Sequence, residues 1–202
     1  MNDISERTIV GFLADIFERR GGEEYLGEPV TMAEHMLQGA HLAEENGEPD
    51  EIVAAALLHD IGHFTSEFGT FSMTDTHDRH HENAGADVLA EFFPSVVTDC
   101  VRHHVAAKRY LCAVDAGYLD KLSEASLHSL RLQGGPMSEQ EVAAFEREPN
   151  LADIVKVRYL DDAGKEPDMK MPGFSHYAPM LQRIVDRHCA VSRAHEQGNR
   201  DL

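Results

Sequence analysis

The sequence predicts an all-α fold, and two observations lead to this prediction. Apolar residues recur at helical spacing, as in residues 4–20, and no segment shows the strict alternation of a β-strand over any length. Capping boxes, in which Ser or Thr is followed three residues later by Glu, are found at Thr31 with Glu34 and at Ser138 with Glu141. We therefore expect a compact helical bundle.

Glycine, asparagine and proline residues divide the first third of the chain into helices. The first predicted helix, over residues 4–20, ends at a Gly-Gly pair. The second, over residues 31–46, runs from its capping box to an Asn-Gly C-cap. A proline opens the central helix, which we predict over residues 49–62 and which carries a His-Asp pair near its end. Residues 65–79 are polar and are predicted to form a loop or lid.

The remaining helices are predicted from similar signals. In chain order they cover residues 80–92, 96–111 and 123–130, begin again at Ser138 and at Asn150, and end with residues 177–189. At 202 residues the chain can bury a core of its own. We expect a single domain over residues 1–192, followed by a polar, frayed tail over residues 193–202.

The composition limits the classes of ligand and location. The formal net charge is -18, so the surface should repel a phosphate backbone, and we expect no nucleic-acid partner. Any anionic substrate must then find a local cationic pocket. Apolar runs are too short for a membrane span, and acidic residues from Asp3 onward do not suit a signal peptide, so we expect a cytoplasmic protein with no membrane partner. The oligomeric state stays open.

A His-Asp pair follows the most apolar run of the chain. His59 and Asp60 come directly after residues 54–58, which read Ala-Ala-Ala-Leu-Leu, so we expect the pair to be buried. A buried carboxylate without a partner costs several kcal/mol. A metal ion beside a histidine would compensate that cost. The alternative is a set of hydrogen-bonded core histidines, which would have to bury several imidazoles and carboxylates without a cation.

Further histidines and one aspartate lie on the neighbouring predicted helices. The candidate ligands are His35, His59, Asp60, His81, His104 and Asp161. Four imidazoles and two carboxylates are too many for one tetrahedral zinc, but they suit two ions that share Asp60 as a bridge. A nitrogen-rich shell without thiolates favours iron, manganese, cobalt or zinc over magnesium or calcium.

These residues carry a resemblance to a known family. The pattern His35…His59-Asp60…Asp161 resembles the signature of the HD-domain superfamily, which contains helical metalloproteins, mostly phosphohydrolases with some diiron oxygenases. Segments 25–28 (Tyr-Leu-Gly-Glu), 107–111 (Ala-Lys-Arg-Tyr-Leu) and 133–137 (Gln-Gly-Gly-Pro-Met) resemble the branch of mixed-valent diiron oxygenases that act on phosphonates. The similarity covers roughly residues 24–165.

The resemblance implies a cofactor and a reaction. Two iron ions in a mixed-valent Fe(II)/Fe(III) state would be bound, with O2 as co-substrate. Asp60 would bridge the ions, while His35, His59 and Asp161 hold one of them, and His81 and His104 hold the other. The enzyme would cleave the carbon–phosphorus bond of a small-molecule phosphonate, 1-hydroxy-2-aminoethylphosphonate or its N-trimethyl analogue. The products would be phosphate and glycine or glycine betaine.

The resemblance also implies roles for residues around the metal ions. Tyr25 would occupy an iron coordination position before substrate binds and Glu28 would hold it there, a pair that we call the Tyr25–Glu28 gate. The candidate substrate-binding residues are His63, Lys108, Ser126, Ser129 and Arg158. Lys108 lies one helical turn after His104, so its charge can reach an anion bound at the metal ions.

Two points remain open in the sequence. His80-His81 and His103-His104 are doublets, and we select His81 and His104 from the spacing to Gly85 and Lys108. The alternative function is an HD-type phosphohydrolase that acts on a nucleotide or a phosphate monoester through metal-activated water. A helical binding module without catalysis is disfavoured because the His-Asp pair is intact.

Overall fold

A computed structural model describes residues 4–25, 27–65, 77 and 80–200 of the chain. The elements are α1 Ile9–Arg20, α2 Met32–Glu45, α3 Asp50–Leu58, α4 Gly62–Thr65, α5 His81–Leu89, α6 Ser95–Val114, the 3-10 helix η1 Leu119–Lys121, α7 Glu124–Leu132, α8 Glu139–Phe145, α9 Leu151–Ala163 and α10 Phe174–Arg200. No strand forms in this part of the chain, which confirms the all-α prediction. Most of the predicted lid over residues 65–79 lies outside the described residues.

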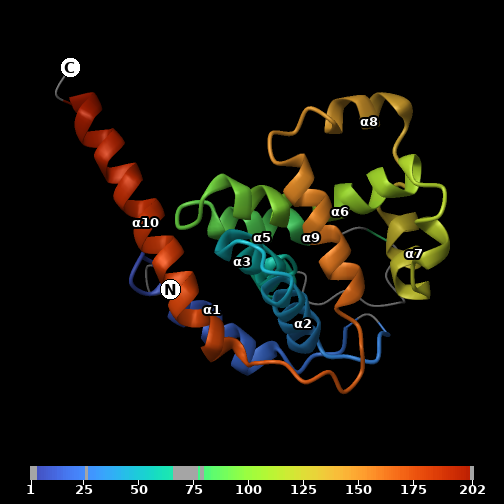
Figure 1. Cartoon of the computed structure of the whole chain (residues 1–202), viewed down its shortest axis with the longest axis horizontal. Coiled ribbons are helices and arrows are strands. Elements are labelled where there is room, and N and C mark those ends of the chain that lie inside the picture. The colour runs from blue at the N-terminus through green and yellow to red at the C-terminus, as the bar shows by residue number, and fades with distance from the viewer. Residues whose placement is uncertain (1–3, 26, 66–76, 78–79, 201–202) are drawn as a thin grey trace.

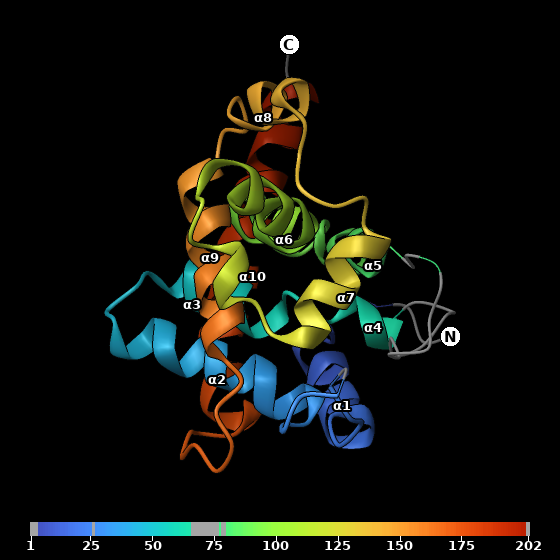
Figure 2. The ribbon, with the colours of Figure 1, turned by 90° about the vertical axis from the view of Figure 1, so that its right-hand side faces the viewer.

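Helix α3 lies at the centre of the molecule. Its residues from Ile52 to Leu58 are all buried, because α2, α6, α9 and α10 pack around it. Figures 1 and 2 show α3 between α2 and α6, with α7 and α8 farther out. A helix that is apolar all round suits this position, since it has no face for water.

The capping signals in the sequence are present in the structure. The Thr31 side chain accepts a hydrogen bond from the backbone N–H of Glu34, and the Glu34 carboxylate accepts one from the Thr31 N–H. Ser138 and Glu141 form the same reciprocal pair at the start of α8. Each box satisfies two backbone N–H groups that the first helical turn leaves without partners.

Three predicted boundaries differ from the structure. Helix α1 begins at Ile9 instead of residue 4, and α3 ends at Leu58, so that His59 and Asp60 lie in the turn before α4. The expected frayed tail is helical in the described residues, since α10 continues to Arg200. Figure 1 shows this last part of α10 extending away from the other helices.

Helices α4 and α5 meet at a close backbone contact. A Cβ atom on Gly62 would lie 1.8 Å from the backbone oxygen of His81, a distance that no side chain can occupy. Only glycine therefore lets the two helix ends approach, and this approach brings the first residue of α5 next to the turn that carries Asp60. None of the helices in the described residues is long and apolar enough to cross a membrane.

Candidate metal centre and pocket

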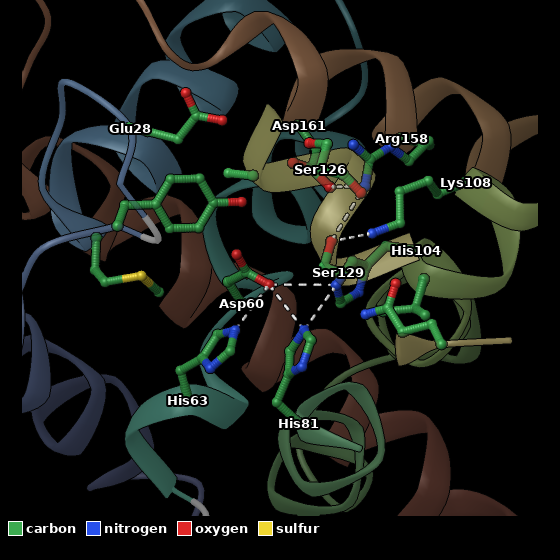
Figure 3. Close-up of a pocket in the computed structure, with 15 residues that line it drawn as sticks. Glu28, Asp60, His63, His81, His104, Lys108, Ser126, Ser129, Arg158 and Asp161 are labelled. Atoms are coloured by element: carbon green, nitrogen blue, oxygen red, sulfur yellow. Dashed lines mark hydrogen bonds and ion pairs between the residues drawn. The ribbon is translucent and has the colours of Figure 1, made fainter. Parts of the chain in front are cut away.

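The six candidate ligands converge in the core from five segments of the chain. His35 lies on α2, His59 and Asp60 lie in the turn after α3, His81 begins α5, His104 lies on α6 and Asp161 lies near the end of α9. All six are buried, with at most 7% of the residue exposed at His81. Figure 3 shows Asp60 between His63, His81 and His104 on one side and Asp161 on the other.

The two carboxylate oxygens of Asp60 face different pairs of histidines. Oδ1 lies 3.2 Å from Nε2 of both His81 and His104. Oδ2 lies 3.4 Å from His59 Nε2 and 3.6 Å from His35 Nε2. Each oxygen therefore belongs to its own group of donors, which is the arrangement of a carboxylate that bridges two ions.

Asp161 completes the group on the Oδ2 side. Its Oδ1 atom lies 3.3 Å from His35 Nε2 and 3.7 Å from His59 Nε2. This oxygen is buried and has no hydrogen-bond partner in the described part of the chain. A buried carboxylate oxygen without a partner is costly, and a cation among these donors would satisfy it.

The outer ring nitrogens fix which histidine atoms face inward. Nδ1 of His35 donates to the Gly164 carbonyl at 2.9 Å, and Nδ1 of His59 donates to the Ala56 carbonyl at 2.8 Å. The Nε2 atoms of both rings therefore face inward and lie 3.0 Å apart. A metal ion bound by both Nε2 atoms would take the place of the proton that the raised pKa of His59 keeps in the cluster. Backbone carbonyls of this kind commonly orient metal-bound histidines.

The second histidine pair has a similar geometry. Nδ1 of His104 donates to the Val101 carbonyl at 2.7 Å, and the Nε2 atoms of His81 and His104 lie 3.1 Å apart. Ligands about 2.1 Å from an ion and at right angles to each other are about 3.0 Å apart. The spacing of the donors therefore fits a pair of metal ions.

The carboxylates draw positive charge into the cluster. Burial alone would lower the pKa of His59, but Asp60 and Asp161 raise it to about 9. Burial opposes ionisation of both carboxyls, yet His59 beside Asp60, and Arg158 beside Asp161, hold both pKa values well below their usual range. Both acids are thus ionised at neutral pH, as metal ligation requires.

The structure separates the members of each histidine doublet. His81 and His104 face Asp60, whereas the side chain of His80 is 69% exposed. The ring of His103 packs edge-on against Phe145, 6.0 Å between centroids. Only His81 and His104 of the two doublets lie among the candidate ligands.

A pocket opens on the Asp60 side of the cluster. Its lining contains the predicted catalytic and substrate-binding residues Tyr25, Glu28, Asp60, His63, Lys108, Ser126, Ser129 and Arg158. The ammonium group of Lys108 donates to the Ser129 hydroxyl at 2.7 Å, as Figure 3 shows. Burial, followed by the charge of Arg158, lowers the pKa of Lys108 to about 7. Lys108 is therefore a buried cation close to its point of titration.

Arg158 is held by several partners beside the candidate ligands. Its Nη1 atom lies 2.6 Å from Asp161 Oδ2, its Nη2 atom pairs with Asp162, and its Nε atom donates to the Tyr118 hydroxyl at 3.0 Å. Three of its five N–H groups are engaged in this way. Arg158 therefore orients Asp161 and lends positive charge to the pocket wall.

The Tyr25 ring and the Glu28 carboxylate have separate contacts. Tyr25 stacks on the His35 ring at 3.9 Å between centroids, and burial followed by the charge of Asp60 raises the pKa of Tyr25 well above its usual range. Glu28 accepts a hydrogen bond from Ser123 and lies 3.7 Å from Lys165 Nζ. The tyrosine is thus a neutral phenol beside a candidate ligand, and the glutamate is held at the pocket wall.

His63 lies between the candidate metal centre and the pocket. Its ring stacks on His81 at 3.9 Å, and its Nε2 atom lies 3.9 Å from Asp60 Oδ1. Burial, followed by the charge of His81, lowers the pKa of His63 well below its usual range, so the ring is neutral. Its Nδ1 atom is buried and has no hydrogen-bond partner in the described residues.

The sequence patterns gave no role to two polar residues of this region. Gln133 lines the pocket, and its buried Oε1 atom has no hydrogen-bond partner in the described residues. The segment Gln-Gly-Gly-Pro-Met pointed to this position without giving it a role. Lys165 donates to the Ser126 hydroxyl at 3.0 Å from a segment that the sequence shows only as polar and proline-containing.

Comparison with known protein families identifies the class of protein. Residues 32–160 match the HD domain family, and the chain belongs to that family. It is 66% identical, over 93% of its length and 96% of the relative, to 1-hydroxy-2-(trimethylamino)ethylphosphonate dioxygenase (glycine-betaine-forming) of Leisingera caerulea. It is 44% identical, over 82% of its length and 83% of the relative, to hydroxymethylphosphonate dioxygenase of Gimesia maris. An uncharacterised protein of Acanthamoeba polyphaga mimivirus is 36% identical over 85% of the chain and 80% of the relative.

These findings confirm the resemblance drawn from the motifs. The HD family and the relatives named as phosphonate dioxygenases agree with the branch predicted from the Tyr-Leu-Gly-Glu and Gln-Gly-Gly-Pro-Met segments. The family and the buried His/Asp groups together support the use of metal. The roles of the individual residues remain predictions.

Proposed function

We propose that this protein is a dioxygenase that cleaves the carbon–phosphorus bond of 1-hydroxy-2-(trimethylamino)ethylphosphonate and forms glycine betaine and phosphate. The observation that carries the proposal is the 66% identity, over 93% of the chain, to a relative named for this activity. The motifs alone left a primary ammonium and a trimethylammonium substrate equally open. The name of this relative favours the trimethylammonium substrate.

The reaction balances with O2 as the oxidant. Substrate and one O2 give glycine betaine, hydrogen phosphate and one proton. The C1–H and carbon–phosphorus bonds break, C1 is oxidised to a carboxylate, and O2 is reduced. No other oxidant or reductant is needed over a full turnover.

We propose that the metal centre holds two iron ions in a mixed-valent Fe(II)/Fe(III) state. Two iron ions supply the redox chemistry that activates O2 toward a C–H bond. His35, His59 and Asp161 would bind one ion, His81 and His104 the other, and Asp60 both. Support comes from the separate donor groups around the two Asp60 oxygens.

Lys108 and two serines suit the phosphonate group. Lys108 is buried and donates to a hydroxyl, whereas Arg158 and Lys165 lie beside carboxylates. Its ammonium group is therefore the cation in the pocket that an incoming anion can engage without breaking an ion pair with a carboxylate. The Ser126 hydroxyl accepts from Lys165 and can donate to a phosphonate oxygen. The Ser129 hydroxyl accepts from Lys108 and donates to the Ser126 carbonyl, an acceptor that it would exchange for the phosphonate.

His63 and Arg158 would act at the edge of the metal centre. The neutral His63 ring can hold a proton on the nitrogen that faces a ligand, and Arg158 keeps Asp161 ionised and correctly oriented. Tyr25, stacked on His35, would cover the metal centre until a substrate displaces it. This cover would keep O2 from reacting in the absence of substrate.

The test is a comparison of three phosphonates with the iron-loaded protein. Oxygen uptake and phosphate release are followed together with the trimethylamino, primary amino and hydroxymethyl substrates. We expect the highest kcat/KM for the trimethylamino compound, one phosphate per O2, and about two irons per chain. Phosphate release from a phosphate monoester without oxygen uptake would instead identify an HD-type phosphohydrolase.

A further inference from the structure

The segment that follows α9 is fixed to α2 on both sides of Lys165. The Gly164 carbonyl accepts from His35 Nδ1 at 2.9 Å. Gln38 bonds both backbone groups of Glu166, with its Nε2 donating to the carbonyl at 2.8 Å and its Oε1 accepting from the N–H at 2.9 Å. Gln38 is itself 1% exposed. The backbone on either side of Lys165 is therefore anchored, and the reach of its side chain is defined.

The Lys165 ammonium group lies among three polar groups, two of which, Ser126 and Glu28, line the pocket. Its Nζ atom is 3.0 Å from the Ser126 hydroxyl, 3.7 Å from Glu28 Oε1 and 3.9 Å from Asp162 Oδ1. It also lies 6.0 Å from the centre of the Tyr25 ring. Its side chain is 13% exposed, and that of Glu28 is 11% exposed. One cation thus contacts a predicted phosphonate-binding hydroxyl and both members of the Tyr25–Glu28 gate.

We propose that Lys165 is a positioning residue that couples the arrival of the phosphonate at Ser126 to the release of the Tyr25–Glu28 gate. This inference rests on the proposed function and extends it to the control of the same site. Before substrate binds, Lys165 neutralises Glu28 and keeps it at the pocket wall. A phosphonate bound at Ser126 presents two negative charges to the same ammonium group.

The exchange of partners follows from charge. A phosphonate dianion is a stronger acceptor for an ammonium group than a carboxylate that already accepts a hydrogen bond from Ser123. When Lys165 turns to the phosphonate, Glu28 loses its nearest cation in a pocket where screening by water is weak. The carboxylate then gains by moving toward water, and the segment that carries Tyr25 moves with it.

The two described cations that line the pocket, Lys108 and Arg158, have other partners. Arg158 is engaged by Asp161 and Asp162, and Lys108 contacts Ser129 on α7. Neither makes a described contact with Glu28. In the described part of the chain, Lys165 is therefore the cation that contacts both Ser126 and Glu28.

The test compares Lys165→Met with Lys165→Arg and with Lys170→Met. Lys170 is an exposed lysine of the same loop and serves as the matched control. We expect Lys165→Met to weaken anaerobic binding of the trimethylamino phosphonate about tenfold by calorimetry. We also expect it to raise oxygen consumption in the absence of substrate several-fold. Lys165→Arg should restore most of both properties, and Lys170→Met should behave like the parent.

Repeating the Lys165→Met measurement in a Glu28→Gln protein distinguishes an effect that acts through Glu28 from a general structural effect. If Lys165 acts through Glu28, the rise in substrate-free oxygen consumption caused by Lys165→Met should disappear when Glu28→Gln is already present. Parental binding and parental oxygen consumption in Lys165→Met would overturn the proposal, as would an equal rise in both backgrounds. A parent protein that consumes no O2 with any phosphonate would instead refute the proposed function.

Discussion

Asp60 connects the two halves of the candidate metal centre through a single side chain. Its two oxygens lie 3.2 Å and 3.4 Å from the nearest donors of different histidine pairs. A neutral side chain of the same shape would keep the volume but lose the charge that two cations need. Substitution of Asp60 therefore tests whether the site binds two metal ions.

We expect Asp60→Asn to lower the metal content from about two ions per chain to less than one. The reason is that asparagine offers one neutral oxygen where two charged ones are required. Metal analysis by plasma emission measures this directly. Asp87→Asn, which changes an exposed carboxylate beside Arg102, is the control and should keep the metal. Full metal content in Asp60→Asn would contradict a bridging role.

Lys108 should make substrate binding depend on pH near neutrality. Its pKa is lowered to about 7, so the ammonium form disappears as the pH rises through this value. Affinity for the phosphonate should therefore fall above about pH 7 in the parent. Lys108→Arg should retain affinity to higher pH because guanidinium stays charged. Binding isotherms at pH 6, 7, 8 and 9 provide the measurement, and superimposable pH profiles would refute the prediction.

The pKa of Lys108 also affects folding. The unfolded chain binds more protons than the native one between about pH 7 and 10.5, the ordinary pKa of a lysine side chain. The free energy of unfolding therefore increases as the pH rises across that window, and this gain from Lys108 is absent below about pH 7.

At the scale of residues, spacing over one or two helical turns was the most informative feature of the sequence. The choice of His81 and His104 from the two doublets agrees with the side chains that face Asp60. Lys165 was not identified because its importance depends on contacts with Glu28 and Ser126, which are far away in sequence. No spacing rule predicts such contacts.

At the scale of elements, the contact between α4 and α5 places His81. The Gly62 backbone lies so close to His81 that an added Cβ atom would meet its carbonyl oxygen at 1.8 Å. A larger residue there must push the helix ends apart. The position of the candidate ligand His81 thus depends on a residue that has no side chain.

Gly62→Ala is therefore expected to destabilise the protein by about 1–3 kcal/mol and to lower metal content. Denaturant unfolding and metal analysis measure the two effects. Gly11→Ala is the matched control, because an added Cβ atom on Gly11 meets nothing within 4 Å. Within α1 it should stabilise by about 0.5–1 kcal/mol. A Gly62→Ala protein as stable as the parent would show that α4 and α5 can separate without cost.

Element boundaries were less predictable than element identity. The apolar periodicity and capping boxes indicated the helices correctly, but the central helix ends before His59 instead of including it. The turn allows His59 and Asp60 to face one cluster together. Local helix propensity favoured a longer helix, but the chain turns after Leu58, where α4 packs closely on α5.

At the scale of the whole molecule, the metal centre joins segments from α2 to α9. Because the ligands come together only in the native fold, metal should bind the folded protein far better than the unfolded chain. The cluster brings four imidazoles and two carboxylates together in the buried core. We therefore expect metal binding and folding to be coupled.

Removing the metal with a chelator should lower the thermal midpoint by about 5–10 °C. An ion present at a hundred times its dissociation constant adds about 2.7 kcal/mol, and about 2–4 °C accompanies each kcal/mol in a chain of this size. Differential scanning calorimetry with and without chelator measures the shift. Asp60→Asn should show little change with chelator. An unchanged midpoint in the parent would contradict the coupling of metal binding to folding.

The sequence by itself determined the helical fold, the family and the candidate ligands. Periodicity, capping and the His-Asp motif are local signals that need no knowledge of distant contacts. Only the tertiary structure decided that the two Asp60 oxygens face separate histidine pairs, that Arg158 is committed to aspartates, and that Lys165 reaches Glu28. The physical reason is that distances between side chains on different helices follow from packing, which depends on all the helices at once.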